Sequence, residues 1–222
     1  MRTLARWHIW LGWLVGLPLL LWTLSGFFMV LKPIEEVRGE DLRIERPVLP
    51  VRVAINDGRT ATMIREGRIF NQRGRSILLA TFTDGSVARL DLESENQRRL
   101  PPVDAGEARS IVAAQIRGGN AVTGLHLFEA DHAPLDLRKP VAAWQVTLAD
   151  GTHVYVGRYT GEIEAIRTRW WRAFDFMWGL HILDLETRED THHFFLVVFA
   201  GLALVGTVMG CTLMFRKRRR QR

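Results

Sequence analysis

Two long apolar runs dominate the pattern of hydrophobic and polar positions along the chain. Residues 7–31 (WHIWLGWLVGLPLLLWTLSGFFMVL) contain no acidic residue, lysine or arginine, and residues 194–215 (FFLVVFAGLALVGTVMGCTLMF) contain no charged residue. About 20 apolar residues form a helix long enough to cross the hydrocarbon core of a bilayer. We therefore predict a transmembrane helix over each run. The first run is too long for the apolar part of a signal peptide, so we expect it to be retained.

Between these runs, apolar and polar residues alternate with the period of β-strands on either side of two Asp-Gly pairs. The stretch 80–97 resembles the stretch 146–163, because each has a strand, an Asp-Gly turn, a second strand and a polar turn. Asp84-Gly85 and Asp150-Gly151 predict β-hairpins with type I′ turns, in which both central residues have positive φ. The second polar turn is Tyr159-Thr160-Gly161-Glu162.

One amphipathic helix is expected before the second hairpin. Asp104, with Glu107 three residues later, has the spacing of a capping box, and Gly118-Gly119 would end the helix. The predicted core positions are Ala108, Ile111, Val112 and Ile116 on this helix, and Trp144, Val146 and Leu148 on the next strand. In the earlier unit, before the first hairpin, we expect extended segments around 51–55 and 62–70, with no helix. The predicted fold class is an α+β domain of antiparallel hairpins with a helix, with or without two degenerate repeats, carried between two transmembrane helices.

Basic residues flank the apolar runs on one side only. Arg2 and Arg6 precede the first run, and RKRRRQR follows the second, so the positive-inside rule places both termini in the cytoplasm. Residues 32–193 would then be periplasmic and the protein would lie in a bacterial inner membrane. The predicted segments are a cytoplasmic N-terminus (1–6), transmembrane helix 1 (7–31), a β-rich first repeat (32–103), a helix-and-hairpin domain (104–168), an amphipathic interfacial helix with a hinge (169–193), transmembrane helix 2 (194–215) and a basic tail (216–222).

The net charge resides in the tail. The chain has 30 Lys and Arg against 24 Asp and Glu, and six of the basic residues lie in 216–222. The remainder is electrically balanced, so a nucleic-acid partner is not expected, and we attribute the basic tail to topology and contact with anionic membrane lipid. Cys211 is the single cysteine, which excludes an intrachain disulfide.

The sequence resembles a known family in two places. AWQVTLADGTHVYVGRYTGE, after the predicted helix, is similar to a PepSY domain, and HIWLGWLVGLPLLLWTLSG is similar to the opening helix of the PepSY-associated transmembrane family. The resemblance implies a periplasmic PepSY domain without catalytic activity of its own. It also implies a partner protein: a flavin reductase, a siderophore-uptake component or a peptidase. Larger relatives have three or more spans, whereas this chain has two and lacks a Gly-rich nucleotide fingerprint.

Glycines and a histidine lie at matched depth on the two apolar runs. His8, Gly12 and Gly16 share one face of the first helix, and Gly206, Gly210 and Met214 share one face of the second. In one interpretation these glycines let the two helices, or two copies in a homodimer, pack closely. In the other, they open a slot for haem b, with His8 as one axial ligand and Met214 or His8 of a second copy as the other.

A second histidine cluster lies before the second span, in WGLHILDLETREDTHHFF at 178–195. His181 and Asp184 are spaced to share a metal ion on one helix face, and His181 with His192 or His193 is a candidate ligand pair for haem. Asp190 is the expected N-cap of the second span. The alternative is a polar collar of salt bridges and hydrogen bonds. His8 and His193 lie at opposite ends of spans on the order of 30 Å long, so one chain cannot place both on one iron.

No constellation for catalysis is present, since H-x-x-H, H-E-x-x-H, C-x-x-C and G-x-S-x-G are all absent. His126, His132 and His153 are predicted to be surface residues, and Thr23 and Ser25 helix-packing groups. The favoured hypothesis is an accessory protein in periplasmic electron transfer or siderophore-iron reduction and uptake, with haem b as its candidate cofactor. The alternative is a periplasmic protein-binding or regulatory module, similar to a peptidase inhibitor, with no cofactor.

Overall fold

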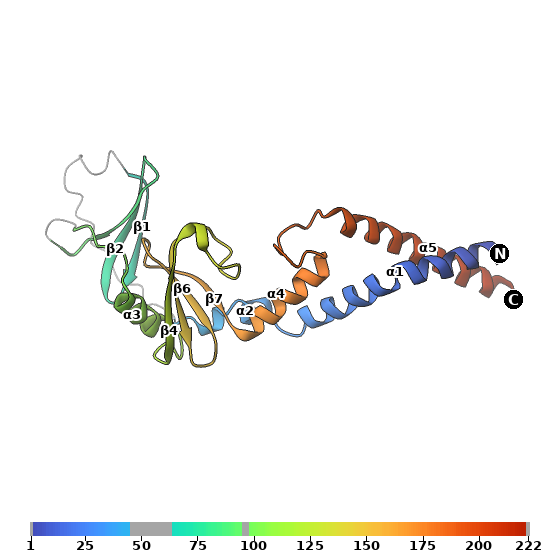
Figure 1. Cartoon of the computed structure of the whole chain (residues 1–222), viewed down its shortest axis with the longest axis horizontal. Helices are drawn as coiled ribbons and strands as arrows, with labels where there is room; N and C mark the ends of the chain where they lie inside the picture. The colour runs from blue at the N-terminus through green and yellow to red at the C-terminus, as the bar shows by residue number, and fades with distance from the viewer. Residues whose placement is uncertain (1, 45–63, 95–97, 221–222) are drawn as a thin grey trace. The chain divides into compact units, whose positions relative to one another are not determined.

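The structure, a computed structural model, describes residues 2–44, 64–94 and 98–220 (Figure 1). The extended segment predicted around 51–55 lies outside the described residues. The chain divides into two compact units, one formed by residues 1–33 and 172–222 and the other by residues 34–171. The first unit holds the apolar helices, and the second holds all the β-strands of the described residues.

Two long helices form most of the first unit. Helix α1 spans Arg2–Met29 and helix α5 spans Phe194–Arg220, and the two pack against each other. Within them, Thr3–Met29 and Phe194–Arg216 are long and apolar enough to cross a membrane. The shorter helix α4, Arg169–Ile182, leads from the second unit into the first. It ends at Ile182, where the next residue, Leu183, adopts a positive φ of 58° that breaks the helix.

The second unit contains two antiparallel sheets, as the α+β prediction requires. The first has the order β1-β2-β3, with β1 at Ile64–Gln72, β2 at Arg75–Phe82 and β3 at Val87–Asp91. The second has the order β4-β5-β6-β7, at Val122–Phe128, Ala143–Leu148, His153–Gly157 and Ile163–Arg167. Short helical turns occur at α2 (Ile34–Val37), η1 (Glu40–Leu42) and η3 (Ala130–His132).

The two Asp-Gly hairpins share one geometry. Ala80 faces Ala88 across the first hairpin, and Val146 faces Val154 across the second. The predicted turn type was wrong in both, because only the glycines, at φ values of 82° and 81°, have positive φ. The aspartate carboxylate in each turn accepts the amide of the residue after glycine, at 2.8 Å, which stabilises an ordinary φ at the aspartate. A pair with positive φ at both centres, Arg73-Gly74, instead connects β1 to β2.

Helix α3, Ala105–Gln115, packs on the second sheet and closes the main core. The Asp104 carboxylate accepts the Glu107 amide at 2.7 Å, which confirms the predicted N-cap. The predicted helix stripe and the strand residues Val146 and Leu148 are all buried in one cluster, and Trp144 packs against it. The Trp144 indole also donates to the Val103 carbonyl at 2.7 Å. Burial of this apolar face is what stabilises the α+β arrangement.

A buried arginine joins the first sheet to α3. Arg89 of β3 is 1% exposed, and its guanidinium pairs with the Glu107 carboxylate at 2.6 Å. It also donates to the Pro101 carbonyl at 2.7 Å and to the Gln72 amide oxygen at 3.1 Å. The second half of the predicted capping box is therefore wrong, since the Glu107 side chain pairs with Arg89 instead of reaching back to the helix start. A buried charge needs such a partner, and this pair draws Glu107 away from the cap.

Candidate functional site at the ends of the apolar helices

Helix α5 presents two glycines to α1. A Cβ on Gly210 would lie 3.1 Å from Cε1 of His8, and a Cβ on Gly206 would lie 3.3 Å from Cδ2 of Leu11. These short separations show that the His8 ring and the Leu11 side chain rest directly on the backbone of α5. Gly12 and Gly16 do not take part, since a Cβ on either would meet nothing within 4 Å. The small residues that permit close approach are therefore those of α5 alone.

The His8 ring fills the space that the haem-slot hypothesis requires. The ring packs on Gly210, so α1 and α5 of one chain are in direct contact at this level. Met214, one turn further along α5, is 60% exposed and so is not held in the same contact. The His8 Nδ1 atom is buried and makes no hydrogen bond to any described residue. The haem site formed by His8 and Met214 therefore stays a prediction, and in this structure Met214 does not share the contact of His8 with Gly210.

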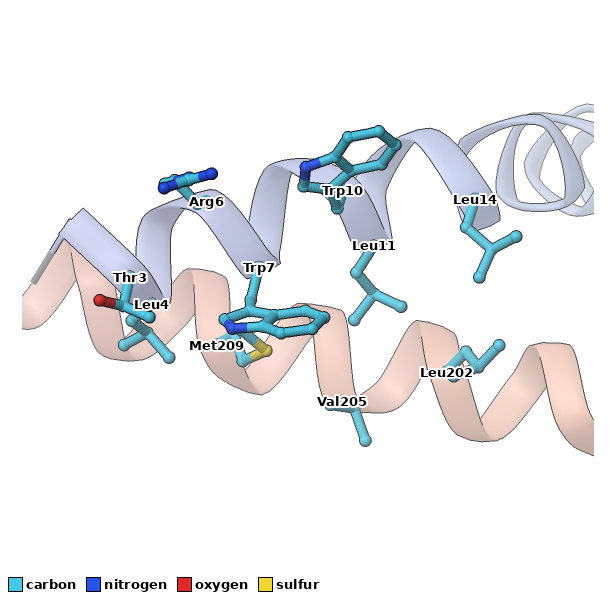
Figure 2. A pocket seen from close by; sticks show the side chains of 10 residues that line it. All are labelled: Thr3, Leu4, Arg6, Trp7, Trp10, Leu11, Leu14, Leu202, Val205 and Met209. Carbon is cyan, nitrogen blue, oxygen red and sulfur yellow. The ribbon is translucent and has the colours of Figure 1, made fainter.

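Beside this contact runs an apolar groove of about 900 Å³, formed by α1 and α5 (Figure 2). Trp7, Leu11 and Leu14 point from α1 toward α5, where Leu202, Val205 and Met209 line the groove. Thr3 and Arg6 lie at the same end of α1. The lining is of the kind that acyl chains fill, because it offers few polar groups to orient a polar ligand.

At the other end of α1, Ser25 contacts His181 of α4. Ser25 is 1% exposed, and its Oγ lies 3.0 Å from His181 Nδ1. The serine hydroxyl donates its one hydrogen to the Leu21 carbonyl at 2.7 Å, with the Trp22 carbonyl next at 3.2 Å. With that hydrogen on a carbonyl, the hydroxyl oxygen accepts from His181, and we therefore assign the proton of the neutral ring to Nδ1 and the free lone pair to Nε2. Gly26 lies beside the ring, and a Cβ there would make an ordinary contact with Cε1 at 3.6 Å.

Aromatic and charged groups hold this histidine in place. The Trp178 ring stacks on His181 with centroids 6.4 Å apart and an interplanar angle of 20°. Its indole donates to the Arg188 carbonyl at 3.1 Å, and the Arg188 guanidinium pairs with the Asp175 carboxylate at 2.5 Å. Asp175 is 6% exposed, so the pair ties the loop after α4 to the body of the helix.

Asp184 organises that loop. Its two carboxylate oxygens accept the amides of Glu186, Thr187, Glu189 and Asp190, and the Thr187 hydroxyl also donates to them. The Thr187 side chain in particular holds the Asp184 pKa below its usual range. The structure therefore directs His181 and Asp184 to different partners, His181 to Ser25 and Asp184 to the loop backbone, instead of to a shared ion.

The last two histidines precede α5. Asp190 Oδ1 accepts the His192 amide at 2.8 Å, and α5 begins at Phe194, so Asp190 is not the N-cap that the sequence predicted. The carboxylate instead closes a separate turn before the helix begins. His192 is exposed, whereas His193 Nδ1 is buried without a hydrogen bond to any described residue. No group of three or more His, Cys, Asp or Glu side chains is positioned for a metal ion in the described part of the chain.

The sequence pattern of one family, the PepSY-associated TM region, matches residues 5–222. The chain belongs to this family. The match includes both apolar helices, which makes this a membrane-associated PepSY protein. No curated protein and no solved structure matches the chain.

Two features of this PepSY protein were missed from the sequence. Ser25 was predicted to be a packing group, although Ser25-Gly26 stands at the end of the stretch HIWLGWLVGLPLLLWTLSG that resembles the family, which is a signal for its position. His153 was predicted to lie on the surface, yet it is only 26% exposed and lies 3.4 Å from Asp136. Asp136 also accepts the Tyr155 hydroxyl at 2.5 Å. His132, 81% exposed, is a surface residue as expected.

Proposed function

We propose that this membrane-associated PepSY protein is an accessory subunit in electron transfer, without catalytic activity of its own, that binds haem b through His181. We further propose that it lies in a bacterial inner membrane with both termini cytoplasmic and residues 32–193 periplasmic. The observation that carries the proposal is the contact between Ser25 and His181, which leaves Nε2 as the free acceptor atom.

Axial histidines use one ring nitrogen on the metal while the other donates to a fixed acceptor. Ser25 is such an acceptor and Trp178 restrains the ring plane, so His181 is oriented before any cofactor binds. His181 lies beside the end of the apolar helix α1, a place where an ionisable residue is a functional candidate. These features favour His181 over the exposed His192 as the first ligand.

His193 is the proposed second ligand, because its Nδ1 is buried without a partner among the described residues and a ligand role would satisfy the ring. His192, the neighbouring residue, is the alternative. A haem ligated by His8 and Met214 is not proposed for a single chain, since the His8 ring packs on Gly210. The open face at Gly12 and Gly16 supports a homodimer instead, in which a second copy packs against α1.

Haem, when bound, would supply one-electron chemistry. The residues of this chain would hold the haem and leave it accessible to an electron donor and an electron acceptor. The electron donor would be a separate protein such as a flavin reductase, because the sequence lacks a nucleotide fingerprint. A ferric siderophore, delivered by an uptake component, is the proposed acceptor. The sheets of the second unit would contact that component, while lipid surrounds the apolar helices.

The test is the absorption spectrum of the full chain, expressed with added haem, purified in detergent and recorded with and without dithionite. We expect Soret and α bands that shift on reduction. His181→Ala should abolish them, Ser25→Ala should weaken them, and His8→Ala, the control histidine at the other end of α1, should retain them. The absence of reducible bands in the unaltered protein would show that the haem proposal is wrong.

A second candidate function, a protein-binding or regulatory module, is favoured by the free edge of the second sheet. Among the described residues, strand β4 pairs with β5 on one side only, and an edge strand of seven residues can accept an extended peptide. A photo-crosslinker at exposed His126 should then capture a periplasmic protein such as a peptidase, while one at exposed Arg109 on α3 should not. Capture at β4 together with a haem-free spectrum would favour this function over electron transfer.

A further inference from the structure

The second unit carries a polar cleft of about 470 Å³ between the segment that follows α2 and strand β7. Arginines dominate its lining, and the residues that matter to the argument are Arg38, Glu40, Arg43, Glu164, Arg167 and Trp171. None of them belongs to the histidine sites described above. Helix α2 and strand β7 both belong to the second unit, and they are drawn close together in Figure 1.

Close backbone packing builds the cleft. Gly39 has a φ of 70°, and a Cβ there would lie 2.8 Å from Cγ2 of Ile166, so only glycine lets this segment approach β7. The Leu42 carbonyl accepts the Arg117 amide at 2.8 Å, and Arg43 forms a bridge with Ile116. The wall that carries Arg38 and Arg43 is thus bonded to the rest of the unit.

Positive charge in the cleft exceeds what its own carboxylates balance. The Arg38 side chain is exposed and has no hydrogen bond or ion pair among the described residues. Arg43 makes one long hydrogen bond, 3.3 Å, to the Ile163 carbonyl. Glu164 is already paired with Lys139 at 2.8 Å, which leaves Glu40 as the carboxylate of the cleft without a cation of its own.

Arg167 lines the base of the cleft. Its guanidinium lies 4.1 Å from the centroid of the Trp171 ring, and it donates to the Asp136 carbonyl at 2.5 Å. Stacking on an aromatic face fixes the plane of the guanidinium without neutralising its charge. The cleft is thus lined by the oriented guanidinium of Arg167 and by two guanidiniums, those of Arg38 and Arg43, that have hydrogen-bond donors to spare.

We propose that this cleft binds a phosphate oxyanion, of the kind carried by an anionic phospholipid headgroup. Guanidinium forks match the oxygens of phosphate and pair with them through two parallel hydrogen bonds. A headgroup is the favoured source because the unit begins at Ile34 and ends at Trp171, so both connections to the apolar helices start beside the cleft. Free inorganic phosphate presents the same oxygens and is the other source.

The test uses the full chain in mixed micelles of phosphatidylglycerol and phosphatidylcholine, with retained lipid counted by native mass spectrometry. We expect the unaltered chain to retain phosphatidylglycerol selectively. The double variant Arg38→Gln/Arg43→Gln should bind it about tenfold less tightly, since two charge-assisted pairs are lost. Arg109→Gln, which removes an exposed arginine on α3, should bind it unchanged.

Inorganic phosphate added at constant ionic strength identifies the source. Displacement of the lipid shows that the phosphate group alone is recognised, and retention shows that the headgroup is required. The proposal is overturned if the unaltered chain does not prefer phosphatidylglycerol, if the double variant binds as tightly, or if Arg109→Gln weakens binding equally. Arg38→Gln alone keeps the test valid should the double variant unfold, because Arg38 has no partner in the described structure to lose.

Discussion

Ser25 and His181 are separated by 156 positions in the sequence and meet at 3.0 Å in the structure. The contact connects the end of helix α1 to the end of helix α4, and it is the basis for assigning the proton of the neutral ring to Nδ1. Ser25, which was predicted to be a packing group, and His181, which was predicted to belong to a cluster of histidines and acidic residues, thus form a contact pair. Its existence gives the candidate site a defined acceptor atom, the Nε2 of His181.

Ser25→Ala should release His181 from its present tautomer. Without the acceptor, the proton is free to move to Nε2, and the loss of one buried hydrogen bond should lower stability by about 1 kcal/mol. Imidazole ¹⁵N shifts of the labelled full chain in detergent report the tautomer. Thr23→Ala, which removes an exposed hydroxyl that bonds only to its own helix, is the control. An unchanged His181 spectrum in Ser25→Ala would contradict the assigned tautomer.

Gly210→Val should separate α1 from α5. The new side chain would meet the His8 ring at 3.1 Å from its Cβ alone, and overpacking of this kind costs about 1–3 kcal/mol. Thermal unfolding in detergent measures the effect. The matched substitution Gly12→Val, on α1, meets nothing within 4 Å and should leave the helix contact intact. Equal losses in both variants would show that helix propensity, and not the contact, sets the result.

Arg89→Met should destabilise the second unit by about 3 kcal/mol or more, because it leaves Glu107 without its buried partner. Denaturant unfolding of the full chain, followed by the β-sheet signal, measures the loss. Adding Glu107→Gln should restore part of it. The surface pair of Arg68 with Glu162 is the comparison, since the Arg68 side chain is 63% exposed and Arg68→Met should cost less than about 1 kcal/mol.

Tyr155 should make stability fall at alkaline pH. Burial, followed by the hydrogen bond to Asp136, raises the pKa of its hydroxyl above the usual value near 10. The folded protein then keeps a proton that the unfolded chain loses, so stability decreases as the pH rises through about 10. Unfolding curves recorded across this range should show a smaller decrease for Tyr155→Phe than for the unaltered chain. Parallel curves would exclude this contribution.

Asp184→Ala should open the loop between α4 and α5. The carboxylate has a lowered pKa, so its contribution is complete above the ordinary value near 4 and is lost as the pH falls through the folded value. Amide hydrogen exchange should therefore be faster in the variant at Glu186, Thr187, Glu189 and Asp190. In the unaltered chain, the same amides should lose their protection only in strong acid. Glu186→Ala, at an exposed position in the same loop, is the control for general disorder. Unchanged exchange would argue against the role of Asp184.

Local patterns were sufficient for the apolar helices, helix α3 and the strands of the two Asp-Gly hairpins, whereas strands β4 and β7 were not predicted. The apolar runs, the alternating strands and the Asp104 cap depend on neighbours a few residues away, and each was recovered from the sequence. The type of the Asp-Gly turns was not, because the carboxylate of each aspartate bonds the amide two residues on and favours a different φ. Asp190 failed as an N-cap for a related reason, since its oxygen bonds the His192 amide before α5 begins.

The sequence by itself determined that the protein has two membrane-type helices, an α+β domain between them and a family resemblance that extends across both, because periodicity and local capping are properties of short segments. Only the tertiary structure decided that His181 meets Ser25, that His8 rests on Gly210, and that Arg89 pairs with Glu107. These contacts join residues distant along the chain, and they depend on how α1, α4 and α5, or the first sheet and α3, pack together. Local patterns carry no information about that packing, so the candidate site could be identified only from the tertiary structure.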